Sequence, residues 1–283
     1  MSMVIGTNVA SLTAQRHLAT SRADLEQSME RLSSGKRINS AMDDAAGLAI
    51  RDRMTSQVNG LNQAVRNAGD AISLGQTAEG ALEESTSILQ RMRELAVQSV
   101  NGTNSADDRT ALNSEVTQLK AELTRISTNS KFNGKVLLDG TFTSQNFQIG
   151  IGKSATDTVS LSVGNMSAES LGDIVGESQV AVGSITLDTA DDSTKAIGSI
   201  DTAIKEVGQE RAKLGAFQNR LEHTVSNLQS MVENTSAAQS RIEDADFATE
   251  SANLAKNQVL QQAGTAMLSQ ANASTQNVLS LLK

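Results

Sequence analysis

The chain has 283 residues, enough for one or two domains with a core of their own, and a net charge of −8 from 24 Lys and Arg against 32 Asp and Glu. This acidic balance opposes nonspecific binding to nucleic acid or to an anionic membrane. The mean hydropathy of −0.26 and the absence of 18 consecutive apolar residues argue against a membrane-spanning helix, and the start MSMVIGTNVASLTAQRH lacks the pattern of a cleaved secretory signal.

Four residue types are missing altogether. The chain contains no Pro, Cys, Trp or Tyr, and five Phe are its only aromatic residues. Without cysteine there is no disulfide, no thiolate metal site and no cysteine nucleophile. A core made of aliphatic residues suits narrow seams between helices better than an aromatic-lined ligand pocket, so we expect no cofactor.

The first predicted element is an amphipathic helix that ends at Ser34-Gly35, and residues 35–40 are the predicted joint to the next helix. Its apolar residues recur at roughly helical spacing: Ile5, Val9, Leu12, Leu18, Leu25, Met29 and Leu32.

A long second helix is predicted over residues 41–100. Its register steps alternately by four and three residues through positions 54, 58, 61, 65, 68, 72 and 75, which is a heptad seam. Ser40 followed three residues later by Asp43 resembles a capping box and predicts where the helix starts.

A third helix is predicted to start near Ser105, where Asp108 repeats the capping pattern. Asn101 to Asn104 would form the turn that lets this helix fold back along the second. Its apolar residues again follow heptad spacing: Leu112, Val116, Leu119, Leu123 and Ile126.

From Phe132 the apolar period changes from seven to two, which predicts a small β-hairpin region over residues 132–163. Asn133-Gly134 and Asp139-Gly140 are turn dipeptides. The alternating apolar residues are Phe147, Ile149, Ile151, Val159, Leu161 and Val163. We expect Phe132, Phe142 and Phe147 to form a local core, and residues 164–195 to be loops with short strands between Val180 and Leu187.

The last third returns to a helical pattern. The register at positions 197, 200, 204, 207, 211, 214, 218, 221, 225, 228 and 232 alternates steps of three and four, and only Arg211 and Gln218 in it are not apolar. A final helix carries Leu254, Leu260, Ala263, Met267, Ala271, Val278 and Leu281.

These elements predict a mainly α fold: an elongated antiparallel coiled-coil or helix-bundle rod formed by the N- and C-terminal segments, with a small β-hairpin region in the middle. We expect residues 1–40 to pair with 241–283, and residues 41–163 with 195–240 to form a heptad bundle. Residues 164–194 would be a short variable surface insert.

The terminal helices are not expected to be stable alone. Burying the seven apolar residues of the first helix contributes roughly 10–20 kcal/mol, whereas fixing its backbone costs on the order of 28–56 kcal/mol. We therefore expect disorder in the free monomer, order on association, and contacts between copies through Ile5, Val9, Leu12, Leu18, Leu25, Met29, Leu32, Leu254, Leu260, Met267, Val278 and Leu281.

Several long motifs, in order, resemble the bacterial flagellins, the subunits of the flagellar filament. They are SSGKRINSAMDDAAGLAI (33–50), QRMRELAVQSVNGTNS (90–105), FNGKVLL (132–138), RAKLGAFQNRLEHTVSNL (211–228), IEDADFATE (242–250), LQQAGTAMLSQAN (260–272) and NVLSLLK (277–283). Many flagellins carry large surface domains at the middle, and the short insert here implies that such domains are missing.

The resemblance implies a structural subunit that polymerises into many-copy helical filaments for swimming motility. It also implies export of the unfolded chain by the flagellar type III route, to an extracellular location. The implied partners are other copies of the chain, a flagellar export chaperone at residues 241–283, and the filament cap and hook-junction proteins.

The resemblance further implies recognition by innate immune receptors. The residues that match the Toll-like receptor 5 contacts of flagellins are Arg91, Leu95 and Glu115, and their alternative role is packing against a neighbouring subunit. The C-terminal Leu279, Leu281 and Leu282 match a segment sensed by cytosolic receptors of the NAIP class.

No catalytic or metal site is expected. Gly150 to Ser154 ends like a phosphate-binding loop, but position 147 is Phe where the pattern needs Gly, so we expect a turn between strands. Asp244, Asp246 and Glu250 lack the glycine and later ligands of a calcium loop and suit the acidic start of a helix. His17 and His223 stand alone, without a second metal ligand nearby.

Two other functions remain open at this stage. A hook–filament junction protein would have a similar helical plan at its ends, and a soluble coiled-coil adhesive or signalling module would share the heptads. The terminal strings favour a flagellin over the junction protein.

Overall fold

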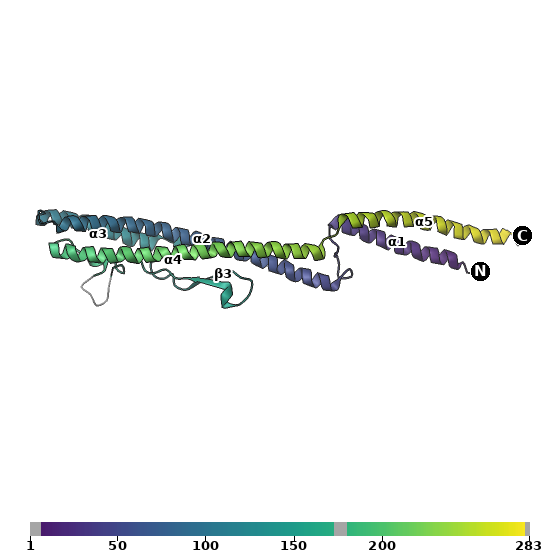
Figure 1. Cartoon of the computed structure of the whole chain (residues 1–283), viewed down its shortest axis with the longest axis horizontal. Coiled ribbons are helices and arrows are strands. Elements are labelled where there is room, and N and C mark those ends of the chain that lie inside the picture. Colours follow the sequence, from purple (N-terminus) through teal and green to yellow (C-terminus); the bar gives the residue numbers. More distant parts are fainter. Residues whose placement is uncertain (1–6, 173–179, 281–283) are drawn as a thin grey trace. The chain divides into compact units, whose positions relative to one another are not determined.

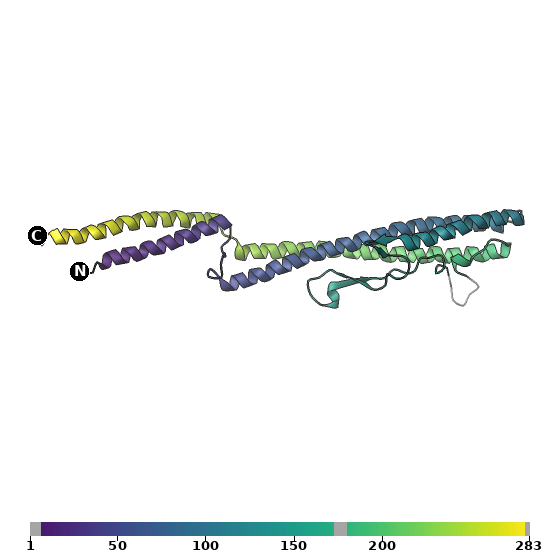
Figure 2. The same cartoon turned by 180° about the vertical axis from the view of Figure 1, so that it is seen from behind.

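The computed structural model describes residues 7–172 and 180–280, which form five α-helices and two small β-hairpins (Figures 1 and 2). The chain divides into two compact units. One unit comprises residues 1–58 and 233–283, and the other comprises residues 59–232. Helices α2 (Ala45–Val100) and α4 (Ala190–Glu243) contribute to both units. The predicted mainly α fold with a small β region is confirmed.

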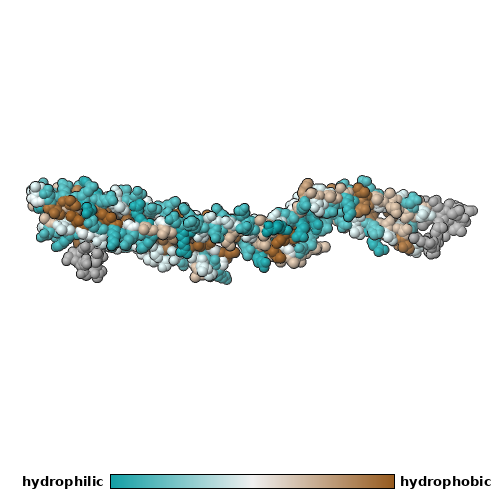
Figure 3. All heavy atoms as spheres, viewed as in Figure 1, coloured by the Kyte–Doolittle hydropathy of each residue, from teal (hydrophilic) through white to brown (hydrophobic). Residues whose placement is uncertain are grey.

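Among the described residues, no helix is long and apolar enough to cross a membrane. Polar residues cover most of the face of the molecule seen in Figure 3.

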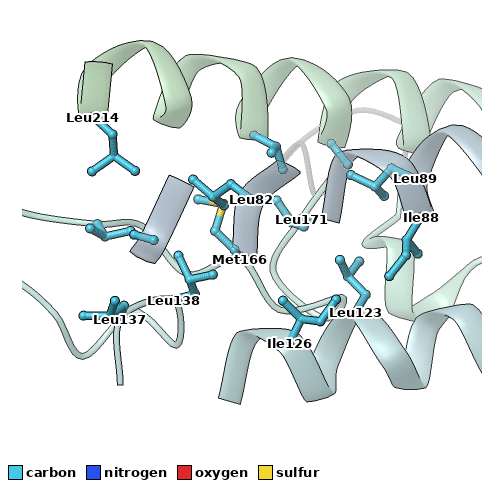
Figure 4. Packing of buried hydrophobic residues seen from close by; sticks show 14 of the residues in the cluster. Leu82, Ile88, Leu89, Leu123, Ile126, Leu137, Leu138, Met166, Leu171 and Leu214 are labelled. Atoms are coloured by element: carbon cyan, nitrogen blue, oxygen red, sulfur yellow. The ribbon is translucent and has the colours of Figure 1, made fainter. Parts of the chain in front are cut away.

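The core of the larger unit lies between α2, α4 and α3 (Ala106–Asn129), which folds back along α2 as expected. In the predicted α4 register, Ile200, Val207, Leu214, Leu221 and Leu228 are buried. The alternate positions are only half-buried, and the buried residues there stand one position earlier, at Ala196, Ala203, Glu210 and Phe217. Leucines of α2, α3, α4 and the connecting segments pack together in Figure 4. The heptad pattern therefore predicted one of the two core-facing positions in each α4 heptad and missed the other by one residue.

One polar residue of the α4 register has a specific partner. The Gln218 amide donates a hydrogen bond to the Glu79 carboxylate at 3.1 Å. The same side chain lies over Gly75, where a Cβ atom would come within 3.2 Å of Gln218 Nε2. The glycine in the α2 register thus gives room for a polar side chain at the helix interface.

Two antiparallel hairpins follow α3. Strands β1 (Lys131–Phe132) and β2 (Lys135–Val136) are joined by Asn133 and Gly134, whose φ angles of 48° and 80° suit the two-residue turn that asparagine and glycine favour. Strands β3 (Gln145–Gln148) and β4 (Thr158–Leu161) pair with Phe147 opposite Val159, within the region where the alternation predicted strands.

The prediction of a separate aromatic core was wrong. Phe142 is buried within the main cluster, and Phe132 and Phe147 pack against its edge. The ring of Phe147 lies 6.0 Å from the ring of Phe217, which is on α4. The phenylalanines therefore attach the hairpins to the helices, because a few short strands cannot enclose a core of their own.

Two strand predictions also fail. Ile151 lies beyond β3 and is exposed, because the chain turns there through Gly150 and Gly152 against the carboxylate of Asp157. In the described part of 180–189, only a single 3₁₀ turn forms (Val182–Ser184), and it is held by the Lys120 ammonium, which donates to the carbonyls of Gly183 and Ile185.

The capping box of α3 is present as predicted: the Ser105 hydroxyl accepts from the Asp108 amide, and the Asp108 carboxylate accepts from the Ser105 amide. The second helix, however, starts at Ala45, four residues later than expected. Ser40 and Asp43 form a separate turn, and the Asp44 carboxylate caps the helix by accepting from the Gly47 amide at 2.8 Å.

Replacement of Leu82 by alanine tests the core. Leu82 is fully buried, so the lost contacts and the remaining cavity should lower the free energy of unfolding by about 2–5 kcal/mol. Urea unfolding followed by circular dichroism measures the loss. The matched control is Glu83→Ala, at the next and exposed position, which should change stability by less than about 0.5 kcal/mol. Equal losses for both variants would contradict this packing.

Candidate association surface

In the smaller unit, helix α1 (Val9–Ser34) lies alongside α5 (Phe247–Ser280) (Figures 1 and 2). The seam between them consists of buried and half-buried residues spaced three and four apart. On α1 these are Ser11, Ala14, Leu18, Ser21, Leu25, Ser28 and Leu32, and on α5 they are Glu250, Leu254, Asn257, Gln261, Gly264, Leu268 and Ala271. Nine of these fourteen residues are small or polar, and the other five are leucines.

Close approach and hydrogen bonds hold this seam. A Cβ atom on Gly264 would lie 3.2 Å from Leu18 Cδ1, so the helices are close at that point. Asn8 donates from its side-chain amide to the carbonyl of Ala271, and the Ser11 hydroxyl bonds to Asn272 Oδ1, both at 3.0 Å. Little apolar area is buried within the pair, and its intrinsic stability is correspondingly low.

Several large apolar residues of the pair are exposed outside the seam. Among the predicted contact residues, Val9, Leu12, Met29, Leu260 and Met267 are exposed by 44–66%, whereas Leu18, Leu25, Leu32 and Leu254 are half-buried in the seam. Phe247 and Val259, which the sequence analysis did not single out, are 69% and 62% exposed. Apolar residues are visible over this unit in Figure 3. Ile5 and Leu281 lie outside the described residues, as does the side chain of Val278 in α5.

A groove of about 680 Å³ runs between the two helices on one side of the seam. It is lined by Val9, Ala10, Thr13, Ala14, His17, Leu18, Ser21, Leu260, Ala263, Gly264 and Met267. The groove and the outward apolar residues together form what we call the association surface. Its chemistry suits another apolar helical surface rather than a polar metabolite.

The joint between the helices, residues 35–44 and 244–246, is fixed by backbone bonds. Gly35 ends α1 at φ +70°, and its carbonyl accepts from the amide of Ala245 at 3.0 Å. Arg37 donates from its amide to the Glu243 carbonyl and from its guanidinium to the Ile242 carbonyl, both at 2.6 Å. These bonds satisfy the last carbonyls of α4, which a helix otherwise leaves free.

Buried carboxylates reinforce the joint. The carboxylate of Glu243 bonds to the Lys36 ammonium and lies 3.6 Å from the Arg51 guanidinium. Burial of Glu243 raises its pKa, but hydrogen bonds from Lys36 and Gln239 and the two positive charges outweigh that effect, so the pKa is lower than usual.

Asp43 is the second anchored carboxylate. It accepts hydrogen bonds from the amides of Ser40 and Asn39 and from the side-chain amide of Gln27 on α1. The Ser40 amide has the largest effect and Gln27 the next, and together they lower the pKa of Asp43 to about 2. The ionised carboxylate thus connects α1 to the turn that precedes α2.

The structure brings two of the three predicted receptor residues together. The guanidinium of Arg91 on α2 lies 2.9 Å from the carboxylate of Glu115 on α3 and 3.0 Å from that of Glu94. Leu95 is only 1% exposed and belongs to the core. Leu279 is in α5 but its side chain is not among those described, and Leu281 and Leu282 lie beyond the described residues.

The segments that suggested other chemistry have structural roles. Gly150 to Ser154 forms the connection between β3 and β4. Asp246 begins α5 by accepting from the amide of Ala248 at 3.0 Å. His17 and His223 are both exposed, and the described residues contain no group of three His, Cys, Asp or Glu side chains placed to hold a metal ion.

Comparison with known families gives two matches that together cover most of the chain. The family model of the bacterial flagellin N-terminal helical region matches residues 5–143, and that of the bacterial flagellin C-terminal helical region matches residues 197–282.

Curated relatives match over the full length. The chain is 44% identical to the flagellar filament 33 kDa core protein of Treponema phagedenis, an alignment covering 99% of this chain and 100% of that protein. It is 39% identical to flagellin A of Vibrio cholerae over 379 aligned positions, covering 100% of both.

Among solved structures, a putative flagellar hook-associated protein from Vibrio parahaemolyticus has a similar fold. Its TM-score is 0.59 at 15% identity, and the match covers 71% of this chain and 100% of that one. At this identity the likeness concerns the fold alone.

Asp43→Asn tests the anchored carboxylate in the assembled chain. Because the folded pKa of about 2 lies below the ordinary 3.8, ionised Asp43 stabilises the joint above about pH 4, and the effect is lost as pH falls from 4 towards 2. Thermal dissociation of assembled chain, followed by sedimentation, should show a lower midpoint for Asp43→Asn at pH 7 and a shrinking difference below pH 4. Asp24→Asn, at an exposed carboxylate of α1, is the control. If the difference in midpoint between Asp43→Asn and the unchanged chain did not depend on pH, the role assigned to Asp43 would be contradicted.

Proposed function

The chain belongs to the bacterial flagellin family of structural filament subunits, and from this membership we propose that it polymerises into a flagellar filament that drives swimming motility. The observation that carries the proposal is the association surface on α1 and α5. Five large apolar residues that the sequence analysis expected at contacts between copies are exposed there, on a helix pair in whose seam most residues are small or polar.

The surface supports contacts that do not close on themselves. Val9, Leu260 and Met267 line the groove, whereas Leu12, Met29, Phe247 and Val259 are exposed outside it, so one copy can place these four residues against the groove of the next. Repeating such a heterologous contact generates an open helical polymer. The terminal helices then gain order from neighbouring copies, and we propose that they are disordered in the free chain.

Export and location follow as part of the same proposal. The chain would pass unfolded through the flagellar type III route and assemble outside the cell. It has no cysteine to form a disulfide and no proline whose isomerisation would delay folding. A flagellar export chaperone would cover residues 241–283 by binding the apolar face of α5. Cap and hook-junction proteins would contact the ends of the polymer.

Among the alternatives, a hook–filament junction protein has less support. The curated relatives that match nearly the whole chain at 44% identity are named flagellin or flagellar filament core protein, whereas the hook-associated structure matches at 15%. A soluble adhesive or signalling module would not account for the match to both flagellin regions.

Toll-like receptor 5 is a second proposed partner. Arg91 and Glu115 are exposed and paired across α2 and α3, so together they present a polar patch to a partner. Leu95 is buried beneath this face, and in the proposal it positions the helix while Arg91 and Glu115 make the contacts. Leu279, Leu281 and Leu282 are the proposed contacts for the NAIP-class receptors.

Seeded growth tests polymerisation. Purified chain mixed with fragments of its own filaments should elongate them, as seen by electron microscopy, and a chain without residues 254–283 should remain soluble because half of the helix pair is missing. Elongation by the truncated chain would contradict the proposal.

A point variant makes the same test without a truncation. Leu260→Gln should raise the concentration needed for growth, because it places an amide on the association surface. Val180→Gln is the matched control, since Val180 and Leu260 are both 44% exposed and Val180 is outside that surface. Similar growth of the two variants would show that the surface does not carry the contact.

Arg91→Ala tests the receptor proposal. Removing the guanidinium should weaken binding of the free chain to the receptor ectodomain roughly tenfold, as expected for truncation of a central interface arginine. Surface plasmon resonance measures the affinity. Arg125→Ala is the control, because Arg125 is a similarly exposed α3 residue paired with Glu122; equal effects of both changes would contradict the assignment.

A further inference from the structure

The oxidant-sensitive chemistry of this chain is confined to thioethers. Cys, Trp and Tyr, which are the other readily oxidised side chains, are all absent, and nine Met remain. The structure separates the described methionines by exposure. Met92 and Met166 are buried in the core, whereas Met29, Met42, Met231 and Met267 are exposed by 45–96%.

Among the four exposed methionines, Met267 alone lines the groove between α1 and α5. It is 65% exposed, and its neighbours on the α5 wall of the groove are Leu260, Ala263 and Gly264. None of these three side chains carries a hydrogen-bond donor. The thioether therefore adds an apolar, flexible side chain to the surface that a second copy would cover.

We propose that Met267 is an oxidation site that controls assembly, with hydrogen peroxide as the oxidant. The Sδ lone pair attacks one peroxide oxygen, a sulfur–oxygen bond forms as the O–O bond breaks, and the other oxygen leaves as water after proton transfer. The sulfur is oxidised to the sulfoxide by two electrons and the peroxide is reduced by two. This inference rests on the proposed polymerisation, because the affected property is association.

The physical consequence follows from the polarity of the product. A sulfoxide oxygen is a strong hydrogen-bond acceptor that water satisfies in the free chain. When another copy covers the groove, that oxygen loses its water, and its neighbours on the α5 wall offer no replacement donor. The side chains of the groove that can donate, Thr13, His17 and Ser21, are on the opposite α1 wall, and the Thr13 hydroxyl already donates to the Val9 carbonyl. Association of the oxidised chain is therefore disfavoured, while folding of the larger unit, which does not contain Met267, is unaffected.

Assembly would in turn protect the site. A covered groove excludes the oxidant, so Met267 in a polymer should react far more slowly than in the free chain. Oxidation would then act on subunits before they are incorporated and leave the existing polymer intact. Methionine sulfoxide reductases, which reverse this modification, would restore the chain to assembly.

In the test, the full-length free chain is treated with hydrogen peroxide, filament seeds are added, and the polymer is sedimented. Peptide mass spectrometry then measures the sulfoxide fraction at each methionine. Met267 in the free chain should oxidise at least tenfold faster than Met92, and the Met267 sulfoxide should be at least tenfold enriched in the supernatant over the pellet. The Met42 sulfoxide should distribute evenly, because Met42 is 96% exposed but is not in the groove.

Leucine and glutamine variants separate the effect of Met267 from that of the other methionines. The variants are made in a Met29→Leu background, which removes the exposed thioether of α1. There, Met267→Leu should polymerise equally well before and after peroxide, whereas Met42→Leu should remain peroxide-sensitive. Without oxidant, Met267→Gln should raise the concentration needed for growth about tenfold, and Met42→Gln should leave it unchanged.

An even distribution of the Met267 sulfoxide between pellet and supernatant, or undiminished peroxide sensitivity of Met267→Leu, would overturn the inference while leaving the proposed polymerisation intact. Slow oxidation of Met267 in the free chain would do the same. Failure of untreated chain to extend seeds would instead refute the proposed function, and the role of Met267 in assembly with it.

Discussion

The structure depends on a helix pair that leaves many of its own apolar residues exposed. The positions of α1 and α5 that face each other include Ser11, Ser28, Asn257 and Gly264, while Leu12, Met267 and Phe247 face solvent. A two-helix coil is usually stabilised by large aliphatic residues in the seam and polar residues outside. Here small and polar residues occupy most of the seam, and several large apolar residues face solvent. Those exposed residues can be buried only against a further surface.

The larger unit follows the opposite rule, and its sequence predicts it well. Its core is mostly aliphatic, and its turns and the α3 cap use residues whose local bonding favours one conformation. Local chemistry and long-range packing agree there, which is why the fully buried positions such as Ile200 and Leu214 and the α3 capping box were predictable. The exception at the start of α2 arose because Ser40 and Asp43 can form a hydrogen-bonded turn without a helix, and only Asp44, near Gly47, has the geometry to cap it.

The association surface was predictable in part. The sequence analysis followed apolar residues, and these include both seam leucines such as Leu18 and outward residues such as Met29, which a list of apolar positions cannot separate. A different signal was present: Ser11, Ala14, Ser21 and Ser28 recur on one face of α1 at spacings of three and seven. Small residues on one helix face permit close approach of a second helix, so this pattern identifies the inner face. The residues of the joint are harder to predict, because Glu243 and Arg51 are far apart in the sequence and only the fold brings them together.

Length variation in this family is compatible with the same reasoning. The two flagellin regions leave residues 144–196 unmatched, and the alignment with the Vibrio cholerae protein has 379 positions for the 283 residues of this chain. Within that stretch, the amide of Gly172 donates to the Glu206 carboxylate at 3.0 Å and the amide of Val180 donates to the Ser199 hydroxyl at 3.3 Å, so both flanks of residues 173–179 are tied to α4. With both flanks held, a longer segment between them would leave the α4 register in place. Insert length can therefore change without altering the heptad core.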